Sequence, residues 1–580
     1  MISLVVRDVL LIAAGFGLYR MWRMVQPSQE WLRLVVAAGF LTRAILGQAL
    51  FWISYLKLPV ARSMQMGNGL WFFGQDALVY FPDAIQAAEK GVWAIITLNR
   101  TSPSVMFEQT LATTVLLFGN AASVGVLLNL FCYLGTMAVI VRWSAKEQRG
   151  RMAAAIAITA ISLSPACVLW SLQPLKDTFF QLLVVAFVAA CAAWQRGWIA
   201  PGQRLTLLLA AATMFVMLFA ISGIRWYFAF ALLLATSFFS LLIAFSTEGR
   251  RILAFTATLV LAVLLSRALV LAARPYLPPT LLRVLTPKET LGAVTELPAS
   301  LLRGIETSRR GFDKVGGRTS IRVGGAVARY DSSSRDGEDP RSLKHDDQAK
   351  NPEIPRLDNP VSQPVNANAR PVNTPSVNAQ PVNTPSVNAR LVNPPPVNAR
   401  PLNTPPLSAP PASTPPASTP PLRPPSATIE ATQSIQSRDT IVLPASHVAR
   451  LVTGGAAIFL PRSVGERLGL FRIGGGRGMF WFVEIDTLVF DLMFLCAFTV
   501  LASRASASLR NPLVVFVALL TLLVAVPLVY TVTNFGTLFR LREMIFLGLA
   551  LTPLALATAS RSEEAAPAGS AAPTPAPEIA

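Results

Sequence analysis

Long apolar segments alternate with short polar or basic segments along most of the 580-residue chain. A helix needs roughly 20 mainly apolar residues to cross the hydrocarbon core of a bilayer, and these segments reach or approach that length. The pattern therefore predicts an all-α polytopic membrane protein with about eleven transmembrane helices, or ten if the first segment does not cross. The expected spans are 2–19, 34–56, 121–142, 152–170, 178–194, 205–222, 226–245, 252–272, 485–503, 512–531 and 542–558.

Residues 273–484 depart from this pattern. Between 330 and 438 a ten-residue unit repeats, as in PVNTPSVNAQ (371–380) and PVNTPSVNAR (381–390). Proline at this density prevents helix and sheet ladders, and few bulky apolar residues are available for a core, so we expect a long disordered Pro/Asn-rich insert. Two interpretations stay open for it, a spacer or tether across the cell envelope and a tolerated insertion in a surface loop.

The sequences on either side of the insert mix apolar and basic residues with glycine-rich turns, which indicates a small extracytoplasmic cap built from two segments. The predicted organisation is an N-terminal membrane domain (1–272) with an outer loop (57–105), a first cap segment (273–329), the insert (330–438), a second cap segment (439–484), C-terminal membrane helices (485–558) and a disordered tail (559–580).

Composition supports the membrane assignment and excludes other classes. Hydrophobic residues make up 53% of the chain and the mean hydropathy is +0.50, too apolar for a soluble protein of this size. The net charge of +19 is spread over loops without zinc-finger spacing or a basic zipper, so we expect contact with membrane lipids and no nucleic acid. The four cysteines lie in apolar runs and both histidines lie between residues 273 and 484, so no metal site is expected. The first residues lack the features of a secretory signal, and we expect the mature protein to begin at Met1.

Lysine and arginine are more frequent in one set of short loops, for example the loops that contain Arg23, Arg149 and Arg251. Such loops face the cytoplasm in most membrane proteins. The outer loop, SLQPLKD (171–177), SGIR (222–225) and TNFGTLFR (533–540) then share the opposite, extracytoplasmic face. The candidate functional residues therefore gather on one side of the membrane, the extracytoplasmic side.

The outer loop carries two carboxylates, Asp76 and Asp83, among aromatic residues. A spacing of seven places both on one face of a helix, although Pro82 can kink that helix. A carboxylate at a membrane surface can act as the base that deprotonates a sugar hydroxyl. The competing interpretation is that Asp76 only caps a helix that begins at Ala77, because aspartate is a favoured N-cap residue.

Charged residues follow at two further membrane edges. Lys176 and Asp177 are either substrate ligands or an interfacial ion pair. Arg225, Arg540 and Arg542 either bind a phosphate, for which the guanidinium offers a planar donor fork, or anchor the chain at the interface. Acid, cations and aromatic residues on one face suit a lipid-phosphate-linked sugar. No Walker A loop is present, and GGGRG (474–478) lacks a strand–helix context, so a nucleotide donor is disfavoured.

Four segments together carry a resemblance to a known family. They are D-x-x-x-Y (Asp76, Tyr80), S-P-x-x-x-x-W-S-x-x-P-L-K-D (Ser164 to Asp177), Arg225 to Tyr227, and N-x-G-T-x-x-R-x-R (Asn534 to Arg542). This order resembles the C-type superfamily of integral-membrane glycosyltransferases, in particular the bacterial family 39-like or dolichyl-phosphate-mannose-mannosyltransferase-like branch. The resemblance spans most of the membrane region and excludes residues 330–438.

The resemblance implies a polyprenyl-phosphate-linked sugar as donor and a glycan, lipid or protein as acceptor. It also implies a catalytic aspartate in the first large outer loop, where Asp76 holds the matching position, and basic residues that bind the donor phosphate, for which Arg225, Arg540 and Arg542 are candidates. From the residues themselves we add Asp83 as a second catalytic candidate and Tyr80, Lys176 and Asp177 as candidate substrate ligands. Members of the family pair the loop aspartate with an adjacent glutamate, whereas Gln75 and Ala77 flank Asp76 here. No cofactor is required by the pattern, and the need for a divalent cation stays open.

The predicted function is thus an inverting membrane glycosyltransferase. Two alternatives remain. A non-catalytic or polymerase-like component of polysaccharide biosynthesis would keep the same fold with a structural Asp76. A transporter would carry charges near the bilayer midplane, and Arg43 is the main internal charge of this kind.

Overall fold

The computed structural model describes residues 4–25, 29–98, 104–144, 148–199, 203–246, 251–275, 277, 440–441, 446–472, 477–532 and 535–564. The expected insert (330–438) and residues 278–329 of the first cap segment lie outside the described residues. So does the tail beyond 564, whereas residues 559–564 extend the last helix.

Within these residues, nine helices are long and apolar enough to cross a membrane. They are α2 (Glu30–Tyr55), α6 (Ser123–Trp143), α9 (Asp177–Ile199), α10 (Arg204–Ser222), α11 (Trp226–Ser246), α12 (Arg251–Ala273), α19 (Arg477–Ser503), α21 (Pro512–Thr531) and α22 (Phe535–Glu564). The prediction of an all-α, multi-pass membrane protein is confirmed. The exact number of spans stays a prediction.

The two other expected spans are helical but differ from these nine. The segment 2–19 belongs to α1 (Leu4–Met24), whose 21 residues include Arg7, Asp8 and two further arginines. The segment 152–170 is divided into α7 (Gln148–Leu163), with 16 residues, and the short α8 (Pro165–Leu169). The division has a local cause, because the Ser164 hydroxyl accepts a hydrogen bond from the Cys167 amide and Pro165 occupies the first turn of α8.

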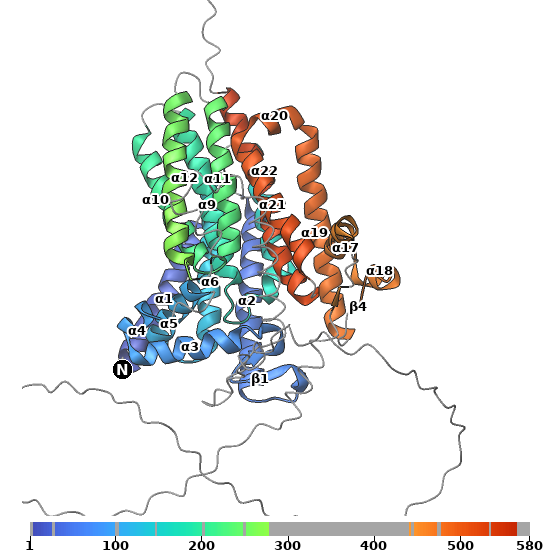
Figure 1. The fold of residues 1–580 in the computed structure, drawn as a ribbon. Coiled ribbons are helices and arrows are strands. Elements are labelled where there is room, and N and C mark those ends of the chain that lie inside the picture. Colours follow the sequence, from blue (N-terminus) through green and yellow to red (C-terminus); the bar gives the residue numbers. More distant parts are fainter. Residues whose placement is uncertain are drawn as a thin grey trace, which may run out of the picture. The chain divides into compact units, whose positions relative to one another are not determined.

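Helices α22 and α9 form the centre of the described bundle (Figure 1). In the 18-residue apolar segments of α22 and α9, 89% and 72% of the residues are buried, whereas the figure for α2 is 28%. Helix α22 packs against α21, α7, α19 and α9, and α9 packs against α10 and α6. An apolar helix that leaves most of its surface uncovered suits a lipid environment, so the outer helices are suited to face the bilayer and the two central helices carry the internal contacts.

The outer loop begins with a hairpin pinned to the end of α2. After a 3₁₀ turn (η1, Arg62–Met64), strands β1 (Gln65–Gly67) and β2 (Leu70–Trp71) pair antiparallel around Asn68 and Gly69, both with positive φ. A Cβ at Gly69 would lie 2.3 Å from the Phe51 ring, so only glycine fits this turn. The Trp71 indole donates to the Leu50 carbonyl at 2.7 Å, which fixes the hairpin.

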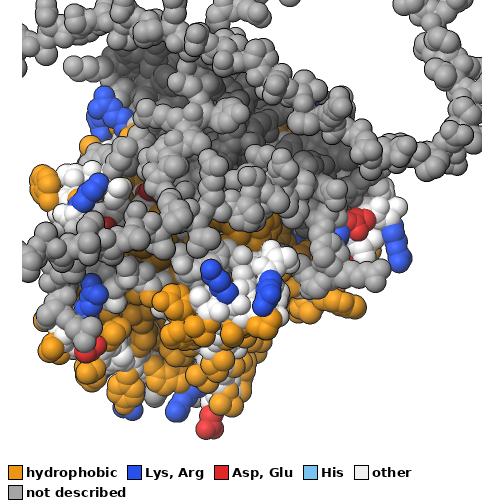
Figure 2. Space-filling model, turned by 90° about the horizontal axis from the view of Figure 1, so that it is seen from below, with side chains coloured by type: hydrophobic (Ala, Val, Ile, Leu, Met, Phe, Trp, Pro, Cys, Tyr) orange, Lys and Arg blue, Asp and Glu red, His pale blue; other side chains and the backbone are white. Residues whose placement is uncertain are grey.

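Three helices complete this loop and the segment after it. They are α3 (Ala77–Lys90), α4 (Val92–Ile96) and α5 (Val105–Phe118), and α3 packs on α5 across one end of the bundle (Figure 1). Helix α3 continues through Pro82 without a break. In the view from below, the described side chains are mainly hydrophobic, with separated lysine and arginine side chains among them (Figure 2).

The described residues of the second cap segment form a small unit against the C-terminal helices. It contains β3 (Thr440–Ile441), α17 (His447–Phe459), α18 (Arg462–Arg467) and β4 (Phe471–Arg472), with β3 paired to β4. Helix α17 packs against α21 and α19. Helix α19 begins at Arg477, earlier than the expected start at 485, and α20 (Ala505–Arg510) joins it to α21.

Arg43 is buried inside the bundle and is bound by backbone carbonyls. Its guanidinium donates to Ile161 O at 2.9 Å and to Ser162 O and Gly39 O at 3.0 Å, and it stacks on the Tyr133 ring. The first two carbonyls belong to the last turn of α7, where no further turn of the helix can pair them. A cation at a helix C-terminus also complements the helix dipole. The structure thus gives this internal charge a structural role.

We expect Arg43→Met to destabilise the protein strongly, because each carbonyl left buried without a donor costs about 1–3 kcal/mol. The measurement is the melting temperature of the purified protein in detergent. Arg33→Met, at an exposed position of the same helix, is the matched control and should leave the melting temperature nearly unchanged. Equal melting temperatures for both variants would contradict this role of Arg43.

Candidate functional site

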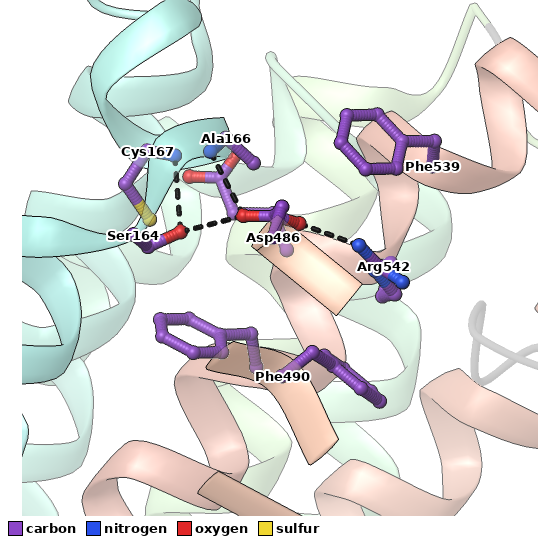
Figure 3. A pocket seen from close by; sticks show the side chains of 9 residues that line it. Ser164, Ala166, Cys167, Asp486, Phe490, Phe539 and Arg542 are labelled. Carbon is purple, nitrogen blue, oxygen red and sulfur yellow. Dashed lines mark hydrogen bonds and ion pairs between the residues drawn. The ribbon is translucent and has the colours of Figure 1, made fainter. Parts of the chain in front are cut away.

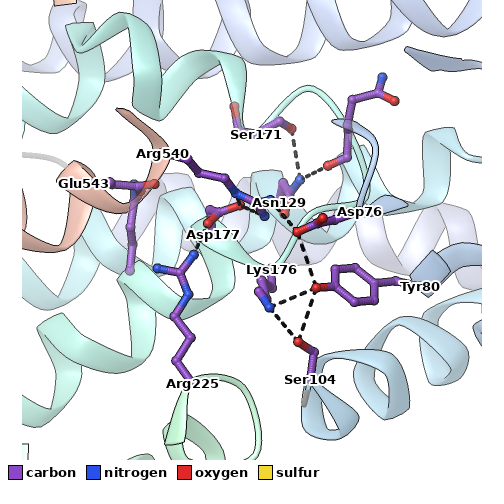
Figure 4. A network of polar contacts seen from close by, with 12 residues as sticks. Asp76, Tyr80, Ser104, Asn129, Ser171, Lys176, Asp177, Arg225, Arg540 and Glu543 are labelled. Atoms are coloured by element: carbon purple, nitrogen blue, oxygen red, sulfur yellow. Dashed lines mark hydrogen bonds and ion pairs between the residues drawn. The ribbon is translucent and has the colours of Figure 1, made fainter. Parts of the chain in front are cut away.

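Side chains from segments far apart in the sequence meet in one polar network (Figure 4). We define the polar network as Asp76, Tyr80, Ser104, Lys176, Asp177, Arg225 and Arg540. Its members come from α3, the residue before α5, the junction into α9, the residue before α11, and the first turns of α22. The structure therefore brings together the outer loop and the three other segments that the sequence placed on one face.

Asp76 is held at the start of α3 by the hairpin before it. The Trp71 amide donates to the Gln173 side chain at 3.2 Å, and Gly74 packs so closely on Gln173 that an added Cβ would lie 3.0 Å from it. Asp76 occupies the N-cap position, but its side chain makes no capping hydrogen bond. The capping interpretation is wrong, because Asp76 Oδ2 instead accepts hydrogen bonds from Arg540 Nη1 and from the Tyr80 hydroxyl, the latter at 3.4 Å.

The segment that carries Lys176 and Asp177 is fixed by α6. Asn129 Nδ2 donates to the carbonyls of Ser171 at 3.0 Å and Gln173 at 2.7 Å. Pro174 lies against Gly125, where a Cβ would come within 2.3 Å of the proline ring. This close packing on α6 positions Lys176 and Asp177 at the edge of the network.

Asp177 is fully engaged by two arginines. Its Oδ1 accepts from Arg225 Nη2, and its Oδ2 accepts from Arg540 Nε at 3.0 Å and Nη2 at 2.6 Å. The side chains of Asp177 and Arg225 are 1% and 2% exposed, and Arg225 lies over the Phe180 ring. Both carboxylate oxygens are thus occupied within the protein. This arrangement favours a role for Asp177 in holding the two arginines in place, rather than the predicted role as a substrate ligand.

Lys176 ends a chain of hydrogen bonds that begins at Asp76. Its ammonium donates to the Tyr80 hydroxyl at 2.9 Å and to the Ser104 hydroxyl at 2.6 Å, and Ser104 donates to Tyr80 at 3.3 Å. Within the described part of the chain, Lys176 forms no ion pair. Because an ammonium has three donors, one N–H of Lys176 is still available to a ligand.

Within the seven residues of the polar network, three cations (Lys176, Arg225 and Arg540) stand against two carboxylates (Asp76 and Asp177). The carboxyl group of Glu543 lies beside the network (Figure 4). The ion pairs that Asp177 forms with Arg225 and Arg540 lie inside the protein, whereas the Asp76 side chain is 41% exposed. The site can therefore attract an anionic group to the edge where Asp76 and Lys176 lie.

The surroundings shift the pKa values of the groups outside the membrane spans. Burial opposes the charge on Asp76, but Arg540 and Lys176 outweigh it and lower its pKa from 3.8 to about 2. Burial lowers the pKa of Lys176 from 10.5 to about 8, although Asp76 counteracts some of this effect. Burial raises the pKa of Tyr80 far above its ordinary value, so the phenol stays protonated and donates to Asp76.

A lowered pKa increases the neutral fraction of Lys176 near pH 8, and an amine attacks acylating reagents only in its neutral form. We expect modification of Lys176 by a small amine-reactive reagent to rise through a midpoint near pH 8, measured by mass spectrometry of the peptide. Exposed Lys90 at the end of α3 serves as the reference peptide. A midpoint at the ordinary lysine pKa of 10.5 would contradict the prediction.

Two predicted site residues lie outside the polar network. Asp83 is partly exposed further along α3. Arg542 is buried in a second cluster beside a small cavity (Figure 3), where it binds Asp486 of α19 and donates to Ile458 O and Thr487 Oγ1 at 3.0 Å. Arg540 and Arg542 therefore do not form one phosphate clamp.

The second cluster ties three helices together around the carboxylate of Asp486. Its Oδ1 accepts from the Ser164 hydroxyl at 3.0 Å and the Ala166 amide at 2.9 Å, while its Oδ2 faces Arg542 (Figure 3). The α7–α8 break is thereby joined to α19 and α22. All of these groups are buried, so this cluster has the character of an internal joint.

Sequence reasoning missed Ser104, Asn129, Asp486 and Glu543. Glu543 lies one turn after Arg540 on α22, and its Oε1 accepts from Gln181 Nε2 beside the network (Figure 4). The spacing from Arg540 was a signal that could have identified Glu543. Ser104 and Asn129 had none, because a single hydroxyl or amide in an apolar segment is common.

Among the described residues, no group of three or more histidine, cysteine, aspartate or glutamate side chains is arranged to hold a metal ion. The four cysteines all fall within these residues and are free. Comparisons with protein-family models, with curated proteins and with solved structures found no match for this chain.

Proposed function

We propose that this protein is a membrane glycosyltransferase that moves a sugar from a polyprenyl-phosphate carrier to an envelope glycan, lipid or protein. The observation that carries the proposal is a partly exposed carboxylate, Asp76, beside the cations Arg540 and Lys176 near the ends of membrane helices (Figure 4). A donor of this class has an isoprenoid tail in the bilayer and one phosphate at its edge. The predicted topology places this edge on the extracytoplasmic side of a bacterial plasma membrane.

Each residue of the site has a separate role in the proposed reaction. Lys176, which has one N–H still available, and Arg540, which is 16% exposed, bind the phosphate of the lipid-linked sugar. Tyr80 and Ser104 orient the Lys176 ammonium. Asp76 accepts the proton of the acceptor's hydroxyl group while the oxygen of that hydroxyl attacks the anomeric carbon. The bond from that carbon to the phosphate oxygen breaks, and the polyprenyl phosphate leaves with the bonding electrons. One displacement of this kind inverts the anomeric configuration.

A second candidate is a non-catalytic or polymerase-like component of polysaccharide biosynthesis. The ion pair of Asp76 with Arg540 favours this candidate, because a carboxylate that is paired inside the protein can serve the fold alone. Arg43 gives the transporter alternative no support, because its guanidinium is bound by the α7 carbonyls.

Lipid analysis of a deletion strain tests the proposal. Loss of a transferase should cause a polyprenyl-phosphate-linked sugar to accumulate, detected by mass spectrometry of lipid extracts, and the wild-type gene should restore the normal level. The Asp76→Asn gene should fail to restore it. Unchanged lipid-linked sugars in the deletion strain would contradict the transferase proposal.

A further inference from the structure

The guanidinium of Arg540 is held unequally on its two edges. Nε and Nη2 both donate to Asp177, which is 1% exposed and is itself paired with buried Arg225. Nη1 alone donates to Asp76, whose side chain is 41% exposed. One edge is therefore fixed inside the protein, while the other is paired with a group that solvent and ligands can reach.

An anion that enters beside Asp76 meets two donor groups with the right charge. Lys176 has one N–H to spare, and Arg540 Nη1 is the outer donor of the fixed guanidinium. Asp76 takes one of the two N–H groups of this nitrogen before the anion arrives. An anion that binds the other N–H is brought next to the Asp76 carboxylate, so the two negative groups weaken each other's contact with Nη1.

We infer that the phosphate of the donor and the Asp76 carboxylate compete for Nη1 of Arg540, and that Asp177 is the positioning residue that keeps the guanidinium in place during the exchange. The nature of the anion rests on the proposed function, whereas the competition rests on the contacts of Arg540. Without a donor, the base is masked by its ion pair. Donor binding releases Asp76 and makes it able to accept the acceptor's proton.

This exchange links the two substrates of the proposed reaction. A carboxylate paired with arginine is a poor base, and loss of the pair beside a bound phosphate raises its affinity for a proton. The hydroxyl of an acceptor, or of water, is then activated only when the donor is present.

Binding of a short phosphodiester to the purified protein tests the competition. The probe is farnesyl methyl phosphate, which carries the single charge of a lipid-linked phosphodiester and no sugar to transfer. Isothermal titration calorimetry in detergent gives its affinity. Asp76→Asn should tighten binding by at least about 5-fold, a typical lower value for coupling between two groups. Glu89→Gln, at an exposed position of the same helix and outside the polar network, should leave the affinity unchanged.

A second background separates competition from simple charge repulsion. In an Arg540→Gln protein no guanidinium is left to compete for, so the further change Asp76→Asn should no longer tighten binding by the same factor. Direct repulsion between Asp76 and the phosphate would give the same gain in both backgrounds and would overturn the inference. Unchanged or weaker binding in Asp76→Asn, with an unaltered melting temperature, would also overturn it.

Asp177→Asn tests the positioning role. It should weaken binding of the probe and also abolish the gain from Asp76→Asn, because Arg540 is no longer held toward the site. If Asp177→Asn lowers the melting temperature so far that binding cannot be measured, the Arg540→Gln pair of variants still decides the competition. Retention of the full gain in Asp177→Asn would contradict the positioning role.

The two proposals fail in different ways. If the chain is not a transferase, the deletion strain keeps normal lipid-linked sugars, while competition can still be seen with the probe. If the transferase proposal holds and the competition does not, sugar transfer depends on Asp76 but Asp76→Asn binds the probe no more tightly than the wild type.

Discussion

Replacement of Asp76 by asparagine should lower the rate of sugar transfer by about 10²- to 10⁴-fold, the usual contribution of a general base. Asparagine keeps the size of the side chain and can still accept from Tyr80, but it cannot take up the proton of the acceptor. The rate would be measured with a radiolabelled polyprenyl-phosphate sugar in membranes, normalised to the amount of the protein.

The amount of folded protein decides how this result is interpreted. Asp76 is partly exposed, so Asp76→Asn should remain in the membrane at nearly the wild-type level. Asp83→Asn is the matched control and should retain transfer. Loss of protein in proportion to the lost activity would instead identify Asp76 as a structural carboxylate and favour the non-catalytic candidate.

The opposite result is expected for Arg542, the predicted phosphate ligand that the structure places in the second cluster. Arg542→Met should destabilise the protein by about 3–5 kcal/mol, because it leaves the buried Asp486 carboxylate without its partner. A large drop in melting temperature and in membrane abundance is the measurement. Transfer per folded molecule should change far less than in Asp76→Asn.

A double variant provides the control for this effect. Asp486→Asn combined with Arg542→Met removes both buried charges, and the asparagine side-chain oxygen can still accept from the Ser164 hydroxyl and the Ala166 amide. The double variant should therefore melt at a higher temperature than Arg542→Met alone. If Arg542→Met keeps the wild-type melting temperature but loses transfer, Arg542 acts on substrate after all.

The general architecture was predictable because the length of an apolar segment is a direct physical signal. A helix in a bilayer needs about 20 apolar residues, and nine helices meet this requirement within the described residues. The break between α7 and α8 was harder to predict, since the apolar composition continues across it. Its signals were Ser164 and Pro165, a favoured N-cap residue followed by a favoured first-turn residue.

The residues that form the candidate site could be predicted better than the contacts between them. Shared topology indicated that Asp76, Lys176, Arg225 and Arg540 lie on one face, and the structure brings them together. Which arginine pairs with which carboxylate depends on helix rotation, which a loop assignment does not specify. Arg540 and Arg542 are two residues apart on α22, so their side chains point in different directions around the helix axis.

This placement on α22 restricts how the protein can change. Arg540 reaches the outer loop and α9, Arg542 reaches α17 and α19, and Glu543 meets Gln181 of α9. An insertion or deletion of one residue before Arg540 in this helix would rotate all three side chains at once by about 100°, the angle between successive residues of an α-helix. Neighbouring regions can lengthen or shorten, but the start of α22 has to keep its register.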